Sequence, residues 1–172
     1  MLTRLSFGVL LVIMASASAF AAENVIFMRH ALAPGVGDPA SFSIDDCNTQ
    51  RNLNDEGRKQ AKEIGRKFRD NDILVTRVLS SPWCRCVDTA EELGLGDWEV
   101  HDGLASFFEG HVDRDETITA LLSELAGIRD DESWLLVTHQ VVIQAVTGIF
   151  VPSGGLVIYD PETRQSRLFT LP

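Results

Sequence analysis

Positive charge is scarce in this 172-residue sequence, where 15 Lys and Arg residues stand against 25 Asp and Glu, for a formal net charge of −10. Proteins that bind nucleic acid need basic side chains to displace counterions from phosphates, so the composition argues against that class. Beyond residue 22 the sequence has no apolar run long enough to span a bilayer, and no group of carboxylates has the spacing of a metal site. Any phosphate site must therefore be a local cationic pocket, and we expect neither a metal nor a cofactor.

Residues 1–21 have the pattern of a cleaved secretory signal peptide. Arg4 precedes an apolar run over 5–14 and a stretch of small residues, in which 19–21 read Ala-Phe-Ala and fit the A-x-A cleavage pattern. The alternative is an uncleaved membrane anchor, because 5–22 is nearly long enough to span a bilayer. The small residues favour cleavage, so we expect a periplasmic or secreted protein without a membrane span in its mature form.

Residues 22–172 are expected to form a single domain, since this length supports one hydrophobic core. The sequence has only three cysteines, Cys47, Cys84 and Cys86. A disulfide can persist in an exported protein, and three cysteines allow at most one bridge within the chain. The spacing alone leaves the connectivity open.

Short apolar runs alternate with segments of helical periodicity. The expected strands are 25–28, 77–80 and 134–138, with a closing hairpin of 156–159 and 167–170. The expected helices follow an N-cap at Asn54 and an N-cap at Ser81, and two more cover 118–125 and 141–147. This alternation predicts a three-layer α/β/α sandwich with a mostly parallel central sheet.

Three of the expected strands end in polar residues, namely Arg29-His30, Ser80-Ser81 and Thr138-His139. In a parallel sheet, ligands bind beyond the carboxyl ends of the strands. Arg29 beside His30 would lower the pKa of the imidazole and repel a metal cation, which suits an anionic ligand. A deprotonated imidazole could then attack phosphorus. Arg85, early in the next helix, could bind phosphate oxygens together with the N–H groups of the helix N-terminus.

At these residues the chain resembles the histidine phosphatase superfamily, whose fold is that of phosphoglycerate mutase. Its opening strand–Arg-His-Gly appears as Phe27-Met28-Arg29-His30-Ala31, and its Ser-x-x-x-Arg-x-x-x-Thr-Ala signature appears as Ser81-Pro82-Trp83-Cys84-Arg85-Cys86-Val87-Asp88-Thr89-Ala90. Its strand–Ser/Thr-His signature appears as Leu135-Leu136-Val137-Thr138-His139. A segment typical of small members appears as Arg51-Asn52-Leu53-Asn54-Asp55-Glu56-Gly57. The four segments cover most of the chain after the leader, in the right order.

The resemblance implies a phosphoglycerate mutase-like fold and a metal-independent phosphatase. By the same resemblance, His30 is the nucleophile that becomes phosphohistidine, while Arg29, Arg85 and His139 bind the phosphoryl group. The substrate would be a small phosphomonoester or phosphoramidate, and for an exported protein an envelope phosphosugar is one candidate.

Further contacts follow from the same resemblance. Arg51 would bind substrate, the alternative being a solvated arginine ahead of a helix, and the backbone N–H of Gln140 is another candidate. The family normally has a glutamate as proton donor, but Ser106 stands in the expected position and a hydroxyl is a poor acid. Glu109 is the nearest carboxylate and the first candidate, the alternative being a surface glutamate. Asp102, Asp113 and Asp115 lie nearby in the sequence and are the other candidates for the proton donor.

Cys86 replaces what is usually a small core-facing residue in the family, so it is expected to stay free. Cys84 directly precedes Arg85, and Cys47 lies four residues before Arg51. Our hypothesis is a Cys47–Cys84 disulfide, which would tie the loop after the first strand to the helix that carries Arg85.

Two other functions stay open. One is an exported phosphate-binding module that has lost turnover along with its acid, and the other is a phosphomutase, which the lack of long insertions disfavours.

Overall fold

The computed structural model describes residues 25–172, so the predicted signal peptide and its cleavage site lie outside the described residues. The strands are β1 (Val25–Arg29), β2 (Arg77–Ser80), β3 (Trp98–Val100), β4 (Trp134–Thr138), β5 (Leu156–Tyr159) and β6 (Ser166–Phe169). The helices are α1 (Asp55–Asp70), α2 (Cys84–Leu93), α3 (Arg114–Leu125) and α4 (Gln140–Thr147), with short 3-10 helices η1 (Cys47–Thr49) and η2 (Asp102–Leu104). Within this part of the chain, none of the helices is long and apolar enough to cross a membrane.

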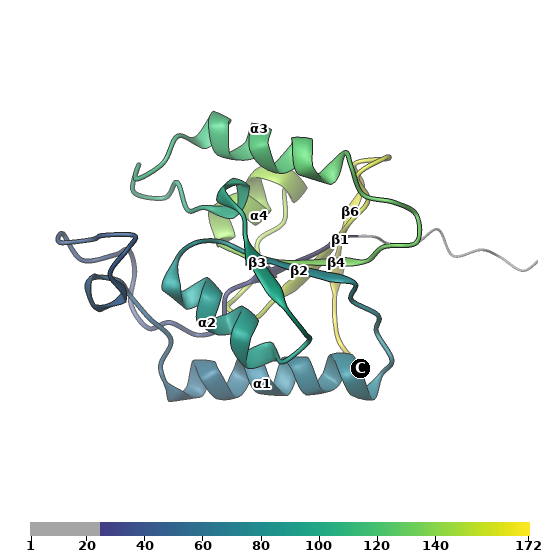
Figure 1. The fold of residues 1–172 in the computed structure, drawn as a ribbon, viewed down its shortest axis with the longest axis horizontal. Helices are drawn as coiled ribbons and strands as arrows, with labels where there is room; N and C mark the ends of the chain where they lie inside the picture. The colour runs from purple at the N-terminus through teal and green to yellow at the C-terminus, as the bar shows by residue number, and fades with distance from the viewer. Residues whose placement is uncertain (1–24) are drawn as a thin grey trace, which may run out of the picture.

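The strands form one sheet in the order β3-β2-β4-β1-β5-β6. The first four strands in this order pair in parallel, whereas β5 is antiparallel to β1 and β6 is antiparallel to β5. Figure 1 shows α3 and α4 on one face of the sheet and α1 and α2 on the other. The predicted α/β/α sandwich with a mostly parallel sheet is confirmed, and so is the closing hairpin. The sequence pattern does not predict β3, because this edge strand has three residues, none of them buried.

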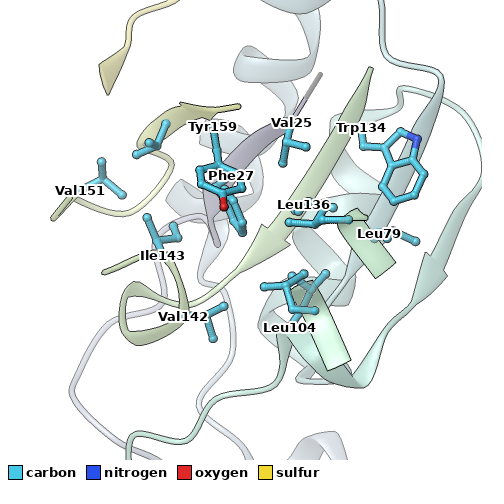
Figure 2. Packing of buried hydrophobic residues seen from close by; sticks show 13 residues of the cluster. Val25, Phe27, Leu79, Leu104, Trp134, Leu136, Val142, Ile143, Val151 and Tyr159 are labelled. Carbon is cyan, nitrogen blue, oxygen red and sulfur yellow. The ribbon is translucent and has the colours of Figure 1, made fainter. Parts of the chain in front are cut away.

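Both faces of the central strands are buried. Val25 and Phe27 of β1 pack into the cluster against α3 and α4 shown in Figure 2, while Ile26 and Met28 pack into a second cluster against α1 and α2. Burial on two sides explains why 25–28 is a continuous apolar run rather than an alternating one. Each fully buried side chain of this size contributes about 1.5–3 kcal/mol to folding.

α1 begins as the sequence predicts. The Asn54 side chain accepts a hydrogen bond from the Gly57 N–H at 2.8 Å and so caps the helix. Further along α1, the backbone comes so close to the end of α2 that a Cβ at Gly65 would lie 1.8 Å from the carbonyl oxygen of Leu93. Glycine is therefore required at this crossing, which brings α1 against the helix that carries Arg85.

The predicted cap of α2 is wrong. The helix begins at Cys84 rather than Pro82, and its N-cap residue is Trp83, which makes no capping hydrogen bond with its side chain. The Ser81 hydroxyl lies 2.8 Å from Nε2 of His139 instead. The local sequence pattern predicts that the Ser81 hydroxyl caps the helix, but His139, which is distant in sequence, competes for this hydroxyl. Arg85 is consequently the second residue of α2.

Candidate active site

The polar ends of β1, β2 and β4 meet at one edge of the sheet, as expected. The backbone N–H of His30 donates to the carbonyl of Thr138 at 2.9 Å, so the ends of β1 and β4 stay paired up to the site. Next to them is a pocket of about 320 Å³. Its lining includes all the predicted catalytic and substrate-binding residues: Arg29, His30, Arg51, Arg85, Glu109, His139 and Gln140. Residues from five separate segments of the chain are thus brought to one cavity.

His30 has one nitrogen held by the backbone and one left over. Its Nδ1 lies 2.7 Å from the carbonyl oxygen of Ala31, which can only accept, so the neutral ring carries its proton on Nδ1. The Nε2 lone pair is then available as a nucleophile. The pKa of His30 is lowered to about 3, chiefly by burial and also by the nearby charges of Arg85, Arg51 and Arg29, against the opposing Ala31 hydrogen bond. The imidazole is therefore neutral near neutral pH.

His139 faces His30 edge-on, with 5.5 Å between the ring centroids. Burial lowers the pKa of His139 well below its usual value, and the positive charge of Arg85 acts in the same direction. Nδ1 of His139 lies 3.5 Å from an Arg85 nitrogen that can only donate, so the ring proton belongs on Nε2, which donates to Ser81. Donation from Nδ1 to a phosphate requires a second proton on this ring, and a bound dianion favours that protonation.

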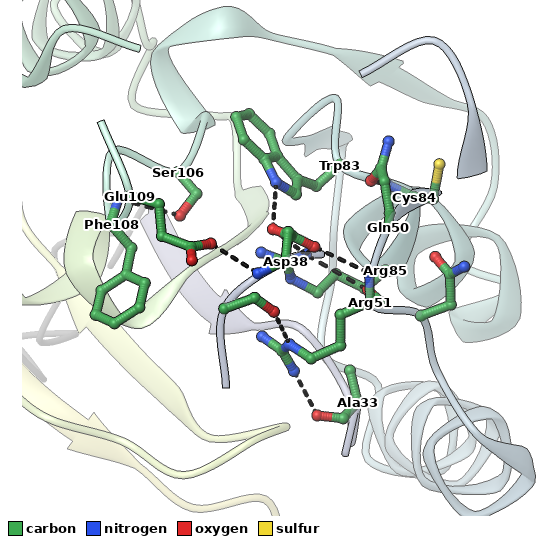
Figure 3. Close-up of polar contacts among 12 residues, drawn as sticks. Ala33, Asp38, Gln50, Arg51, Trp83, Cys84, Arg85, Ser106, Phe108 and Glu109 are labelled. Carbon is green, nitrogen blue, oxygen red and sulfur yellow. Dashed lines mark hydrogen bonds and ion pairs between the residues drawn. The ribbon is translucent and has the colours of Figure 1, made fainter. Parts of the chain in front are cut away.

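Arg85 is paired with a residue that the sequence analysis missed. One of its terminal nitrogens lies 2.8 and 3.1 Å from the two carboxylate oxygens of Asp38, and both side chains are almost fully buried. Asp38 also accepts from the Trp83 indole N–H at 3.1 Å and from the Arg51 backbone N–H at 2.9 Å (Figure 3). Burial alone would raise the pKa of Asp38, but the Arg51 N–H and the charge and hydrogen bond of Arg85 outweigh it and lower the pKa. Asp38 thus fixes the position of Arg85.

Two guanidinium groups in the site have N–H donors left over. Nε of Arg29 and Nε of Arg85 are buried and have no hydrogen-bond partner among the described residues. One terminal nitrogen of Arg29 donates to the Val151 carbonyl at 3.1 Å, which orients that side chain. Unsatisfied buried donors are costly, and those of a cation more so. An anion with several acceptor oxygens is the ligand that would satisfy them.

The loop after β1 folds over this pocket. Arg51 donates from Nε to the Gly37 carbonyl at 2.9 Å and from a terminal nitrogen to the carbonyl of Ala33. The Glu109 carboxylate accepts from the Asp38 N–H at 2.7 Å, from the opposite side of the loop (Figure 3). Arg51 is therefore part of the site and is not a solvated arginine. Glu109 both lines the pocket and holds the loop.

The other candidate acids lie outside the pocket, as do the two histidines of the same region, His101 and His111. Asp113 caps α3, while Asp102 and His111 line a neighbouring cavity beyond Trp83. His101 caps η2 by accepting from the Gly103 N–H. Ser106 does line the phosphate pocket and is buried, with its hydroxyl accepting from the Phe108 N–H at 3.5 Å. Glu109 remains the carboxylate that faces the pocket among these candidates.

The side chain of Gln140 supports the site indirectly. It accepts from the Val151 N–H at 2.9 Å and donates to the Ile149 carbonyl at 3.3 Å, which holds the segment whose carbonyl orients Arg29. Gln140 is also the first residue of α4, so the N-terminus of this helix is at the pocket wall. Helix N-termini favour negative charge. Residues 25–172 contain no group of three side chains able to hold a metal ion.

The structure joins Cys47 to Cys84 in a disulfide and leaves Cys86 free, which is the pairing proposed from the sequence. Next to the bridge, the Gln50 side chain accepts from the Cys84 N–H at 2.9 Å. Burial raises the pKa of the Cys86 thiol to about 12. A thiol in this state is unreactive, so Cys86 takes the role of a core residue.

A comparison with models of known protein families agrees with the geometry of the site. The family model described as "Histidine phosphatase superfamily (branch 1)" matches residues 25–119, which is more than half of the chain. No curated protein sequence matches the chain.

Several solved structures share the fold. The protein histidine phosphatase SixA complexed with tungstate has a TM-score of 0.57 and 20% identity, covering 85% of this chain and 94% of its own. Rv3214 from Mycobacterium tuberculosis has a TM-score of 0.60 and 18% identity, covering 86% and 95%. The mycobacterial glucosyl-3-phosphoglycerate phosphatase Rv2419c has a TM-score of 0.58 and 17% identity, covering 84% and 95%. At these identities the likeness establishes the architecture alone.

Proposed function

Because the chain belongs to the histidine phosphatase superfamily, we propose that it hydrolyses a phosphomonoester or phosphoramidate through a phosphohistidine on His30. One observation carries the proposal: a neutral imidazole shares one pocket with guanidinium groups, and among residues 25–172 its Nε2 and two guanidinium donors have no partner. Phosphoryl transfer depends mainly on placing the nucleophile and neutralising the phosphate oxygens. This pocket supplies both inside a protein of formal net charge −10.

In the first step, Nε2 of His30 forms a bond to phosphorus as the bond from phosphorus to the leaving oxygen or nitrogen breaks. The leaving group departs with that electron pair and takes a proton from Glu109. In the second step, water attacks the phosphohistidine and gives a proton to Glu109, and the N–P electron pair returns to His30. Arg29 and Arg85 neutralise the phosphoryl oxygens in both steps.

Intact-mass spectrometry after rapid mixing with phosphoramidate tests the reaction. We expect turnover, together with an adduct of one phosphoryl group that peptide mapping under alkaline conditions places on His30. Turnover with an adduct elsewhere, or with none, would contradict the proposal. Tight binding of tungstate with no turnover would favour the phosphate-binding module instead.

Glu109 is the proposed proton donor, because it faces the pocket and the other candidate carboxylates do not. Glu109→Gln is expected to lower kcat about 10²-fold for an alkyl phosphate, whose leaving group needs a proton. With nitrophenyl phosphate, which has a good leaving group, the loss should be small. Steady-state kinetics with both substrates measures the difference, and Asp102→Asn serves as the control that changes neither. Equal losses on the two substrates would assign Glu109 a structural role only.

We also propose that the protein is exported to the periplasm or the medium. The leader pattern over 1–21 supports this, as does the disulfide, since such bonds persist in oxidising compartments. Intact-mass spectrometry of the protein recovered from the periplasmic fraction is expected to give the mass of residues 22–172. A mass that retains the leader would favour the membrane anchor.

A further inference from the structure

Three exposed apolar side chains surround the mouth of the phosphate pocket. Val36 is 89% exposed, Phe150 67% and Phe108 57%, and all three line the pocket. They come from three segments: the loop after β1, the segment after η2 and the segment after α4. Exposed large apolar residues scattered singly need no explanation, but several gathered at one cavity mark a binding surface.

Two of the polar side chains that line the pocket, Gln140 and Glu109, are already engaged, whereas the exposed side-chain amide of Gln144 has no partner within residues 25–172. The Gln140 amide is bonded to the backbone of Ile149 and Val151, and the Glu109 carboxylate is bonded to the N–H of Asp38. A sugar brought to this surface would find few free partners for its hydroxyls, and unpaired polar groups oppose binding. The cationic side chains of the pocket are buried or half-buried, whereas its large apolar side chains are exposed at the mouth.

Resting on the proposed function, we infer that the substrate is a phosphomonoester of a small apolar alcohol, whose hydrocarbon group contacts Val36, Phe108 and Phe150. The pocket volume of about 320 Å³ lies at the lower end of the range of roughly 300–1,000 Å³ for small-molecule sites. A short alkyl or single-ring aryl group fits that size. The apolar contacts and the small pocket together narrow the substrate class, and they disfavour the envelope phosphosugar.

Binding of two phosphonates, which cannot be hydrolysed, tests the inference separately from turnover. By calorimetry, hexylphosphonate is expected to bind at least tenfold more tightly than methylphosphonate, because one methylene group alone is worth roughly 10-fold or more in an apolar pocket. Phe150→Ser and Phe108→Ser should each reduce this ratio severalfold and leave the Kd of methylphosphonate unchanged. Leu168→Ser and Leu74→Ser are the matched controls, since both residues are similarly exposed and lie outside the pocket.

Kinetics gives a second readout. Hexyl phosphate and glycerol 3-phosphate have similar primary leaving groups and differ in the polarity of the chain. We expect kcat/KM to favour hexyl phosphate at least tenfold, and the Phe150→Ser variant to lose this preference through KM. Equal binding of the two phosphonates, or preference for glycerol 3-phosphate, would overturn the inference. Loss of turnover with chain-length dependence intact would count against the proposed function alone.

Discussion

A His30→Ala variant is expected to lose turnover by on the order of 10⁴-fold or more, while still binding tungstate. The methyl group cannot form the bond to phosphorus, so no phosphoenzyme accumulates. The guanidinium groups of Arg29 and Arg85 remain to bind a tetrahedral oxyanion. Steady-state assays measure the first result and calorimetric titration measures the second.

His101→Ala is the matched control for this variant, because His101 lies outside the phosphate pocket and its side chain accepts from the Gly103 N–H. Its turnover should stay within severalfold of the wild type. The wild-type pH profile adds a check: with a pKa of about 3, His30 is neutral above that pH, so its protonation should not reduce activity between pH 5 and pH 8. Substantial turnover in His30→Ala would remove His30 from the mechanism.

Asp38→Ala is expected to lower the free energy of unfolding by about 3–5 kcal/mol, because it leaves the Arg85 charge buried without its partner. The side chains of this pair are only 4% and 2% exposed, so water cannot replace the lost carboxylate. Urea denaturation monitored by circular dichroism measures the change. Asp45→Ala, an exposed position in the same loop, should change the free energy by less than about 0.5 kcal/mol.

The pH dependence of stability separates this ion pair from a simple packing effect. The pKa of Asp38 is lowered in the folded protein, so its contribution is complete above the unfolded value near 3.9 and is lost as pH falls through the lower folded value. The difference in the free energy of unfolding between the wild type and Asp38→Ala should therefore become smaller in strongly acidic solution. A variant as stable as Asp45→Ala would show that Arg85 is adequately solvated without Asp38.

Local patterns predicted the parts of the site that are attached to regular elements. Arg29, His30 and His139 directly end buried apolar strands, and the ends of parallel strands meet at one edge of a sheet. Their meeting thus follows from strand recognition alone. Arg85 required the family signature as well, because a helix carries many positions and periodicity does not single one out.

Asp38 could not be predicted in the same way. It lies in a long loop that also contains Asp45 and Asp46, and no strand or helix period distinguishes the three. Its importance depends on the tertiary approach of Trp83 and Arg85, which are distant in sequence. The wrong cap at Ser81 has a related cause, since the Ser81 hydroxyl contacts His139, which directly follows β4 and is distant in sequence.

The bond between Cys47 and Cys84 has a consequence for how this protein can diversify. It anchors the far end of the covering loop beside Arg85, while pairing of β1 with β4 anchors the near end at His30. With both ends pinned, the tip between them can change in length at little cost, since loop-closure entropy grows only as the logarithm of length. The surface that meets the organic part of a substrate can therefore be remodelled while the phosphate chemistry beneath it is left intact.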